Sequence, residues 1–406
     1  MLLKPIAQSV VPRIRLAIEA IGVKHGGGAT VLSDLLTAAA GDDRFERIFV
    51  LSSPRSARHF TLPCADKIVD VECPVSEANK IYRLWWIERR LQAWLRAANC
   101  QIVLCLSGCG IGGVGAPHVT MIQQSLPFSP DVCRTMRGFD RLRFKLLRHA
   151  MKRSCRSSRR VIVQTETMRK VVSDAFSIHR GRIEVITPCA RVLGKPEQHS
   201  AALDAMRRTK AGLRVLYVGN QSSYKNVPVL LNAIERLRAH LPEISLSLTW
   251  PLDHPARDRE GVVCIGYLQG DALAEALSLA DVFVMPSLQE TVALPILEAM
   301  SAGIPVIAAD RPYAHEICQG AAVFFTPHDS AELARQIELV LTNRKVSSTL
   351  VSEGFRISRE RERAQPYKRM LDVLYLAATA DPQVALELPE KENSQSISPG
   401  DKAIRT

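Results

Sequence analysis

Apolar residues along the first half of the chain gather in short runs, separated by segments with helical spacing. Five such runs lie before residue 190, at Ile14 to Ile18, Ile48 to Leu51, Ile102 to Leu106, Val119 to Ile122 and Val161 to Val163. Short uninterrupted apolar runs are typical of strands that are buried on both faces of a sheet. The pattern therefore predicts a parallel sheet with helices on both sides.

The alternation starts again after residue 211. Strands are predicted there in LRVLYVGN, ISLSLTW, VVCIG, DVFVMPS and PVIAA. Helices are predicted between them in VPVLLNAIERLRAHL, DALAEALSLA and LPILEAMSAG, and Gly303 ends the last of these. The second half thus predicts a second doubly wound domain.

With 406 residues, the chain is too long for one ordinary hydrophobic core. We expect an α/β fold with an N-terminal Rossmann-like domain over 1–190, a linker over 191–211 and a C-terminal Rossmann-like domain over 212–365. A helix over 366–380 would pack back on the first domain, and the polar tail 381–406 would be disordered. Ligands bind at the carboxyl ends of strands in open parallel sheets, so the two domains would face each other across a cleft.

Composition narrows the class of protein. Hydrophobic residues make up 47% and charged residues 23% of the chain, as in packed globular proteins. The ten cysteines form no CxxC pair and have no histidine at zinc spacing, which indicates reduced, mostly buried thiols in a cytoplasmic protein. Pro5 and Pro12 interrupt the apolar start, which argues against a signal peptide, and no run is long enough to span a membrane. We expect membrane contact, where it occurs, to be peripheral.

The formal charge of +12 indicates an anionic partner, which could be a membrane surface, a phosphate-rich substrate or nucleic acid. Between Arg134 and Arg160, eleven basic residues stand against one acid, Asp140. Upstream, the segment NKIYRLWWIERRLQAWLRAAN combines arginines with Trp85 and Trp86, as in a helix lying on anionic lipid. An ordinary amphipathic helix with both tryptophans in the core, and a merely solvated basic face, are the alternatives. Nucleic acid is disfavoured, because no recognised binding motif accompanies the charge.

Candidate chemistry lies in residues 286 to 316. Glu290 falls in the loop after a predicted strand, and Glu298 falls eight positions later on the following helix. Glu290 can hold ligand hydroxyls at the mouth of that helix, and Glu298 can accept two hydrogen bonds from a vicinal diol such as ribose. The helix N-terminus between them favours a phosphate. Alone, two such glutamates are more often solvated surface charges.

The full frame PSLQETVALPILEAMSAGIPV resembles the signature of family 4 glycosyltransferases, whose usual form is PS-x-x-EGFGLP-x-x-EAM-x-x-G-x-PV. The resemblance is clear over residues 213–342 and fainter over the first half. It implies the GT-B fold, a retaining reaction, a nucleotide diphosphate sugar as donor, and no cofactor or metal. It also assigns Glu290 and Lys225 as catalytic residues, and it gives a donor site made of Gly219, Asn220, Lys225, Glu290, Thr291, Val292, Ala293, Leu294 and Glu298.

The sequence departs from the family pattern at two places in this site. Asn220 stands where an arginine is expected, which leaves Lys225 as the main cation on the leaving diphosphate. Thr291, Val292 and Ala293 replace the Gly-Phe-Gly of the family, which narrows the space for backbone amides to approach the sugar.

In the first half, Gly26, Gly27 and Gly28 resemble the glycine loop that these enzymes place against donor and acceptor. A plain turn is the alternative interpretation of three glycines. Gln123 and Gln124 occupy the place where the family often has a histidine or asparagine against the transferred sugar. Neither glutamine can act as a base, so the resemblance implies catalysis by positioning and electrostatics.

The resemblance implies a hexosyltransferase that acts on a glycan or lipid-linked acceptor in bacterial polysaccharide or lipopolysaccharide biosynthesis. Two alternatives remain open at this point. The chain could be a non-catalytic relative that binds a nucleotide sugar or a partner enzyme, or it could be an enzyme of another class on the same fold, such as a nucleotide-sugar epimerase or a phosphorylase.

Overall fold

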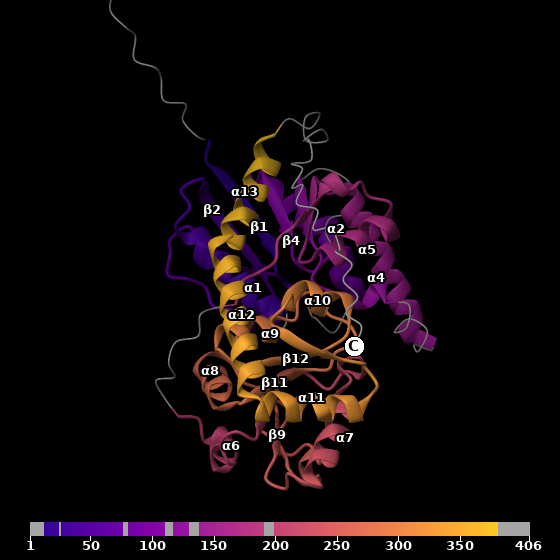
Figure 1. The fold of residues 1–406 in the computed structure, drawn as a ribbon. Helices are drawn as coiled ribbons and strands as arrows, with labels where there is room; N and C mark the ends of the chain where they lie inside the picture. The colour runs from indigo at the N-terminus through magenta and orange to yellow at the C-terminus, as the bar shows by residue number, and fades with distance from the viewer. Residues whose placement is uncertain are drawn as a thin grey trace, which may run out of the picture.

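The computed structural model describes residues 12–23, 26–75, 80–109, 117–129, 138–190 and 199–380. It forms two parallel sheets, each covered by helices (Figure 1). The start of the chain, the linker positions 191–198 and the predicted disordered tail 381–406 lie outside the described residues.

The N-terminal sheet has the order β3-β2-β1-β4-β5-β6-β7, and every neighbouring pair is parallel. Its strands are β1 Ile14–Glu19, β2 Phe45–Ser52, β3 Ile68–Glu72, β4 Ile102–Cys105, β5 His118–Met121, β6 Arg160–Val163 and β7 Ile183–Val185. The five apolar runs of the sequence fall on five of these strands. The edge strand β3 has no such run, because its residues alternate between apolar and acidic and are only partly buried.

Helices cover both faces of this sheet. They are α1 Gly27–Ala40, α2 Lys80–Ala97, α4 Gly138–Ser157 and α5 Glu166–Phe176. The apolar core beneath α1 is continuous with that of the C-terminal domain, whereas α2 packs in a second core and α4 and α5 share a third. Of the two tryptophans, Trp86 is buried in the core beneath α2, but Trp85 is 46% exposed, so the prediction of a core helix holds for only one of them.

The C-terminal sheet has the order β10-β9-β8-β11-β12-β13 and is also fully parallel. Its strands are β8 Arg214–Tyr217, β9 Ser245–Leu248, β10 Val262–Cys264, β11 Val282–Met285, β12 Val306–Ala309 and β13 Ala322–Phe325. Its helices are α6 Asp204–Arg208, α7 Val227–Arg238, α8 Gly270–Leu279, α9 Leu294–Ser301, α10 Pro312–Cys318 and α11 Ser330–Thr342. The prediction of two doubly wound Rossmann-like domains is confirmed.

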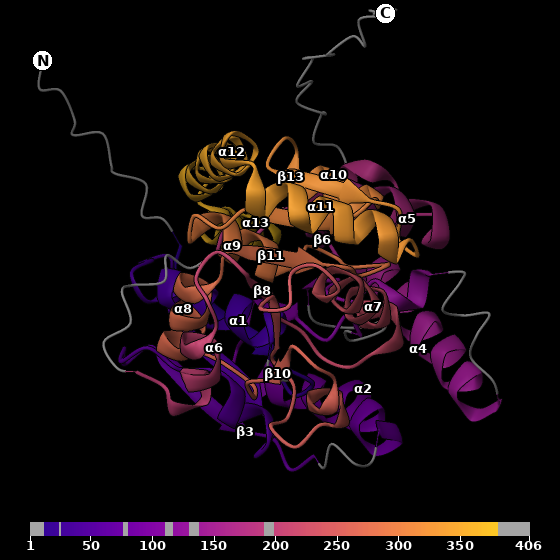
Figure 2. The same ribbon diagram turned by 60° about the horizontal axis from the view of Figure 1, so that its bottom comes forward.

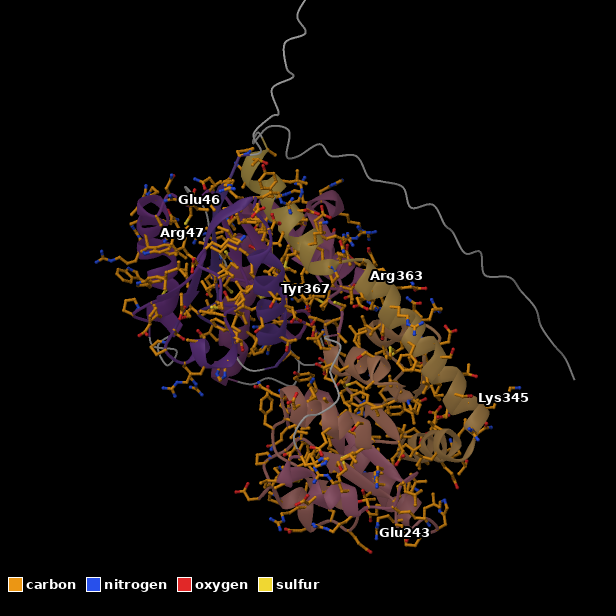
Figure 3. The ribbon with its side chains drawn as sticks, turned by 90° about the vertical axis from the view of Figure 1, so that its left-hand side faces the viewer. Glu46, Arg47, Glu243, Lys345, Arg363 and Tyr367 are labelled. Carbon is orange, nitrogen blue, oxygen red and sulfur yellow. The ribbon has the colours of Figure 1, made fainter. Side chains whose placement is uncertain are left out.

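The chain returns to the N-terminal domain through two successive helices, α12 Arg344–Arg363 and α13 Pro366–Thr379. Figure 3 shows Arg363 and Tyr367 where these helices meet, beside both domains. Helix α12 packs on α9, and α13 packs on α1. The Tyr367 hydroxyl donates a hydrogen bond of 3.0 Å to Asp34 of α1, and Arg44 pairs with Asp372 at 2.7 Å. The crossover helix α13, near the end of the chain, therefore packs on the N-terminal domain and ties the two domains together.

The nine cysteines in the described part of the chain are all free thiols, and six of them are buried. Burial raises the pKa of Cys73, Cys155 and Cys318 to about 12, so these thiols stay protonated near neutral pH. Among the described helices, none is both long and apolar enough to cross a bilayer.

Candidate active site

The strand order of the C-terminal domain sets the position of the candidate site. The chain leaves β8 toward β9 on one side, and it later enters β11 on the other side of β8. The loops that follow β8 and β11 therefore lie at the carboxyl edge of the sheet, at the switch point where open parallel sheets bind ligands. We call the junction of this edge with the N-terminal domain the crevice. Lys225 lies after β8, and Glu290 lies after β11.

Lys225 and Glu290 form an ion pair in this crevice. Lys225 Nζ lies 2.5 Å from Glu290 Oε1, and their side chains are only 12% and 13% exposed. Burial lowers the pKa of Lys225, but the Glu290 carboxylate more than offsets this, so the pKa lies above its ordinary value. Lys225 is therefore a fixed cation at the crevice. A backbone hydrogen bond of 2.8 Å from Leu288 to Tyr224 ties the two loops together.

The loop after β8 is shaped by Tyr217 and Asn220. The Tyr217 hydroxyl donates to the Asn220 carbonyl at 3.1 Å, and a Cβ atom at Gly219 would overlap that hydroxyl, so this position requires glycine. Asn220 Oδ1 accepts a hydrogen bond of 3.0 Å from the backbone N–H of Ser222. The amide that replaces the expected arginine thus shapes a turn, and Asn220 itself is exposed.

The loop after β11 leads directly into α9. Val292 and Ala293 are buried, and Ala293 precedes the helix with φ 49° and ψ 63°, in the left-handed region. The family pattern has glycine at this position, and an alanine there carries a steric cost of about 1–2 kcal/mol. The loop therefore keeps a left-handed backbone although its sequence has lost the glycine.

Glu298 lies on the second turn of α9, close enough to Asp34 of α1 for the two carboxylates to interact. Burial, with the Asp34 carboxylate as a second cause, raises the pKa of Glu298 to about 7. No described contact joins Glu298 to the Lys225–Glu290 pair. The two glutamates of the signature thus occupy different parts of the crevice, with the N-terminus of α9 between them.

The N-terminal domain brings its glycine turn to the same place. A Cβ atom at Gly27 would lie 3.2 Å from Leu294 Cδ1, and one at Gly28 would lie 3.0 Å from Gln123 Oε1. Gly26 precedes them with a φ of 98°. Leu294 and Gln123 thus approach the turn from opposite domains, whereas Gln124 is exposed.

Two contacts across the crevice involve three residues outside the predicted site, Thr165, Gln289 and Ser125. Thr165 Oγ1 donates to the Thr291 carbonyl at 3.2 Å, and Gln289 Nε2 donates to the Ser125 carbonyl at 2.9 Å. Both lie beside predicted site residues, but threonine, serine and glutamine in loops carry no specific sequence signal. Their pairing depends on the closeness of two domains, which local sequence patterns do not encode.

In the described part of the chain, no group of three or more His, Cys, Asp or Glu residues could hold a metal ion. A cavity of about 650 Å³ lies apart from the ion pair, at the junction of α1, α12 and α13, where its lining includes Arg44, Cys189 and Tyr367. Lys225, Glu290 and Glu298 are not among the residues that line this cavity.

Comparison with protein families divides the chain in the same way as the fold. Residues 25–190 match the model described as Glycosyltransferase Family 4, and residues 212–343 match the model described as Glycosyl transferases group 1. The two matches cover both Rossmann-like domains.

Similar curated proteins match part of the chain. The sulfoquinovosyl transferase SQD2 of Arabidopsis thaliana is 34% identical over 32% of this chain and 27% of that protein. The O-antigen chain mannosyltransferase B of Escherichia coli is 29% identical over 30% of this chain and 35% of that protein. The chain thus spans about a third or less of the length of these relatives.

Solved structures extend the similarity of fold over nearly the whole chain. WaaG, a glycosyltransferase involved in lipopolysaccharide biosynthesis, superposes with a TM-score of 0.69 at 16% identity, covering 88% of this chain and 99% of WaaG. Anabaena HepE in complex with UDP and glucose superposes with a TM-score of 0.67 at 17% identity, covering 89% of this chain and 99% of HepE. The architecture is therefore that of the GT-B glycosyltransferases.

Proposed function

The chain belongs to glycosyltransferase family 4, and we propose that it transfers a sugar from a nucleotide diphosphate sugar to a glycan or lipid-linked acceptor, with retention of configuration at the anomeric carbon. The observation that carries the proposal is the Lys225–Glu290 ion pair, part-buried at the switch point between β8 and β11. Removing two charges from water costs free energy that their attraction only partly repays, so a part-buried pair at a ligand-binding edge is better explained by function than by stability.

Lys225 is proposed to stabilise the diphosphate as the glycosidic bond breaks. Its raised pKa keeps the ammonium charged while the pyrophosphate oxygens gain negative charge. The N-terminus of α9, which begins at Leu294, adds backbone N–H groups and the positive end of the helix dipole. Glu290 holds the ammonium in place and can accept hydrogen bonds from hydroxyls of the sugar.

Glu298 is proposed to bind the ribose of the nucleotide. A carboxylate can accept hydrogen bonds from both hydroxyls of a vicinal diol, and Glu298 is separated from Glu290 by residues 291–293 and the first turn of α9. The diphosphate would then lie over the helix N-terminus, with ribose on one side and sugar on the other. In this arrangement the segment from the end of β11 through α9 contacts the sugar, the diphosphate and the ribose.

The proposed reaction needs no dedicated base. The bond from the anomeric carbon to the diphosphate oxygen breaks, and the diphosphate leaves with the electron pair. The acceptor oxygen attacks from the same face, and its proton passes to a diphosphate oxygen. The protein positions the reactants and stabilises charge through Lys225, with Gln123 and the turn at Gly27 and Gly28 facing the sugar. We propose that no metal or other cofactor takes part.

The acceptor class is proposed from the relatives. One similar protein is an O-antigen chain mannosyltransferase, and one neighbour in fold, WaaG, is involved in lipopolysaccharide biosynthesis. A role in assembly of a bacterial polysaccharide or lipopolysaccharide follows as the proposal. UDP is the first nucleotide to test, because HepE has been solved with UDP-glucose.

A thermal-shift screen tests the donor site. The purified protein is melted with UDP, GDP, ADP and their common sugar conjugates, because a ligand that binds the native state raises the midpoint. We expect a shift with one base that is lost in Glu298→Ala. The control is Glu338→Ala, which removes a surface carboxylate of α11 that is 41% exposed. An unchanged midpoint of the parent protein with every one of these nucleotides would overturn the donor assignment.

A further inference from the structure

Helix α4, Gly138–Ser157, has two faces of different chemistry. Its inner face is buried against β5 and α5, with Met151, Ser154 and Cys155 at most 1% exposed. Its outer face carries two leucines, Leu142 and Leu146, which are 54% and 61% exposed. At about 100° per residue, positions 142 and 146 lie one turn apart and nearly opposite the inner face. Both leucines therefore point away from the core of their own domain.

The rest of the outer face is cationic. Between Arg141 and Ser157 the sequence holds seven lysines and arginines and no aspartate or glutamate. Helical spacing puts Lys145, His149 and Arg153 on the same side as the two leucines. Each of these three side chains is exposed. Hydrophobic residues at one end of a cationic face are typical of segments that lie on an anionic lipid surface.

The position of this face relates it to the candidate active site. Helix α4 contacts the short turn Leu126–Phe128, which follows Gln123 and Ser125. Ser125 accepts the hydrogen bond from Gln289 across the crevice. Figures 1 and 2 show α4 standing out from the body of the N-terminal domain in both views. A surface that this helix touches would therefore lie near the opening of the crevice on its acceptor side.

We propose that the outer face of α4, defined by Leu142, Lys145, Leu146, His149 and Arg153, docks the protein on an anionic lipid bilayer. The two leucines insert among the acyl chains near the headgroups, and the cations contact the lipid phosphates. Charge alone would suit any polyanion, but it gives no reason for two large apolar side chains to face water on a basic helix. Lipid accounts for both features.

Vesicle sedimentation tests the docking face. The full chain is mixed with vesicles of phosphatidylglycerol and phosphatidylcholine, or of phosphatidylcholine alone, without nucleotide. We expect the parent to bind to the anionic vesicles only. The double variant Leu142→Gln, Leu146→Gln should bind these vesicles about tenfold more weakly than the parent. The matched control is Leu252→Gln, Leu376→Gln, which changes two leucines that are each 56% exposed outside this helix, and it should bind like the parent.

A second variant separates lipid insertion from simple charge attraction. Lys145→Gln, Arg153→Gln should weaken binding and make it less dependent on salt, because fewer phosphates are contacted. Circular dichroism checks that both double variants stay folded. Two results would overturn the proposal. One is equal binding of the leucine variant and the parent to anionic vesicles. The other is binding to a DNA duplex that competes with the vesicles and is unchanged in the leucine variant. Since no donor is present, this result is independent of the proposed transfer reaction.

Discussion

Glu316 of the C-terminal domain caps a helix of the N-terminal domain through Thr167. Glu316 Oε2 accepts hydrogen bonds from the backbone N–H of Thr167 at 2.9 Å and from its hydroxyl at 2.7 Å. Glu316 Oε1 accepts a third from the backbone N–H of Glu166 at 2.5 Å. A carboxylate at this position satisfies N–H groups that the first turn of α5 leaves without partners. The contact therefore couples closure of the crevice to helix capping.

We expect Glu316→Ala to loosen the two domains. Losing hydrogen bonds to a charged acceptor costs about 1.5–3 kcal/mol, and the cost here falls on the contact between domains. Small-angle X-ray scattering should show a larger radius of gyration than that of the parent. Glu338→Ala is the control, because Glu338 pairs with His240 inside the C-terminal domain. Identical scattering of the Glu316 variant and the parent would show that this cap does not hold the domains together.

Lys225→Ala should depress turnover strongly. Removal of one group that stabilises developing charge typically lowers kcat about 10²- to 10³-fold, and the nucleoside diphosphate should also bind more weakly. The measurements are product formation and calorimetric affinity for the diphosphate. Lys210→Ala provides the matched control, since Lys210 is 63% exposed and pairs with Glu243 at the surface. Wild-type turnover in the Lys225 variant would remove this lysine from the proposed mechanism.

Stability should fall as pH rises through the titration range of Glu298. Its pKa is raised from 4.5 to about 7 in the folded protein, so the unfolded state releases this proton first. The folded state is therefore penalised between about pH 4.5 and 7, by up to about 3 kcal/mol once both states are ionised. Denaturant unfolding at several pH values measures the effect. Glu298→Gln should flatten the profile in this window, and an unchanged slope would contradict the shift.

The Asp34 carboxylate is the second cause of that shift, so Asp34→Asn should move the Glu298 transition to lower pH. The same substitution alters the hydrogen bond from Tyr367 of the crossover helix. The Asp372→Asn variant serves as the control. Asp372 lies on the same helix as Tyr367 and pairs with Arg44, but it is not among the groups that shift the pKa of Glu298. The same shift of the Glu298 transition in both variants would show that it comes from loosening of the crossover helix rather than from loss of the Asp34 charge.

The sequence predicted the sheets well because buried parallel strands are short apolar runs, and β8 and β11 both have that form. It also placed Glu290 and Lys225 in loops after their strands. The ion pair between them could not be predicted, because 65 residues separate the two side chains along the chain and only the strand order brings them together. The different exposure of Trp85 and Trp86 could not be predicted either, because side chains at neighbouring positions on a helix point about 100° apart.

Ala293→Gly should stabilise the protein. Ala293 has a φ of 49°, and glycine adopts this region without the steric cost that alanine carries there. After the greater entropy of glycine in the unfolded chain is subtracted, we expect a gain of about 0.5–1 kcal/mol in the free energy of unfolding. Ala93→Gly is the control: Ala93 is exposed in the interior of α2, so glycine should cost about 1 kcal/mol there. Equal losses in both variants would contradict the strained conformation.

Asn220→Arg tests whether the missing arginine limits the reaction. Asn220 is exposed, so the crevice can accept a longer side chain, although the turn would lose the hydrogen bond from the Ser222 N–H to Asn220 Oδ1. A second cation beside Lys225 should improve stabilisation of the leaving diphosphate, and we expect turnover or donor affinity to rise about tenfold. Asn220→Gln controls for the loss of the turn without adding charge.

If the arginine variant only matches the glutamine variant, then Lys225 and the N-terminus of α9 already supply the charge that the donor needs. A gain that disappears when Lys225→Ala is added would instead show that the two cations act on one diphosphate, because independent sites would give additive effects.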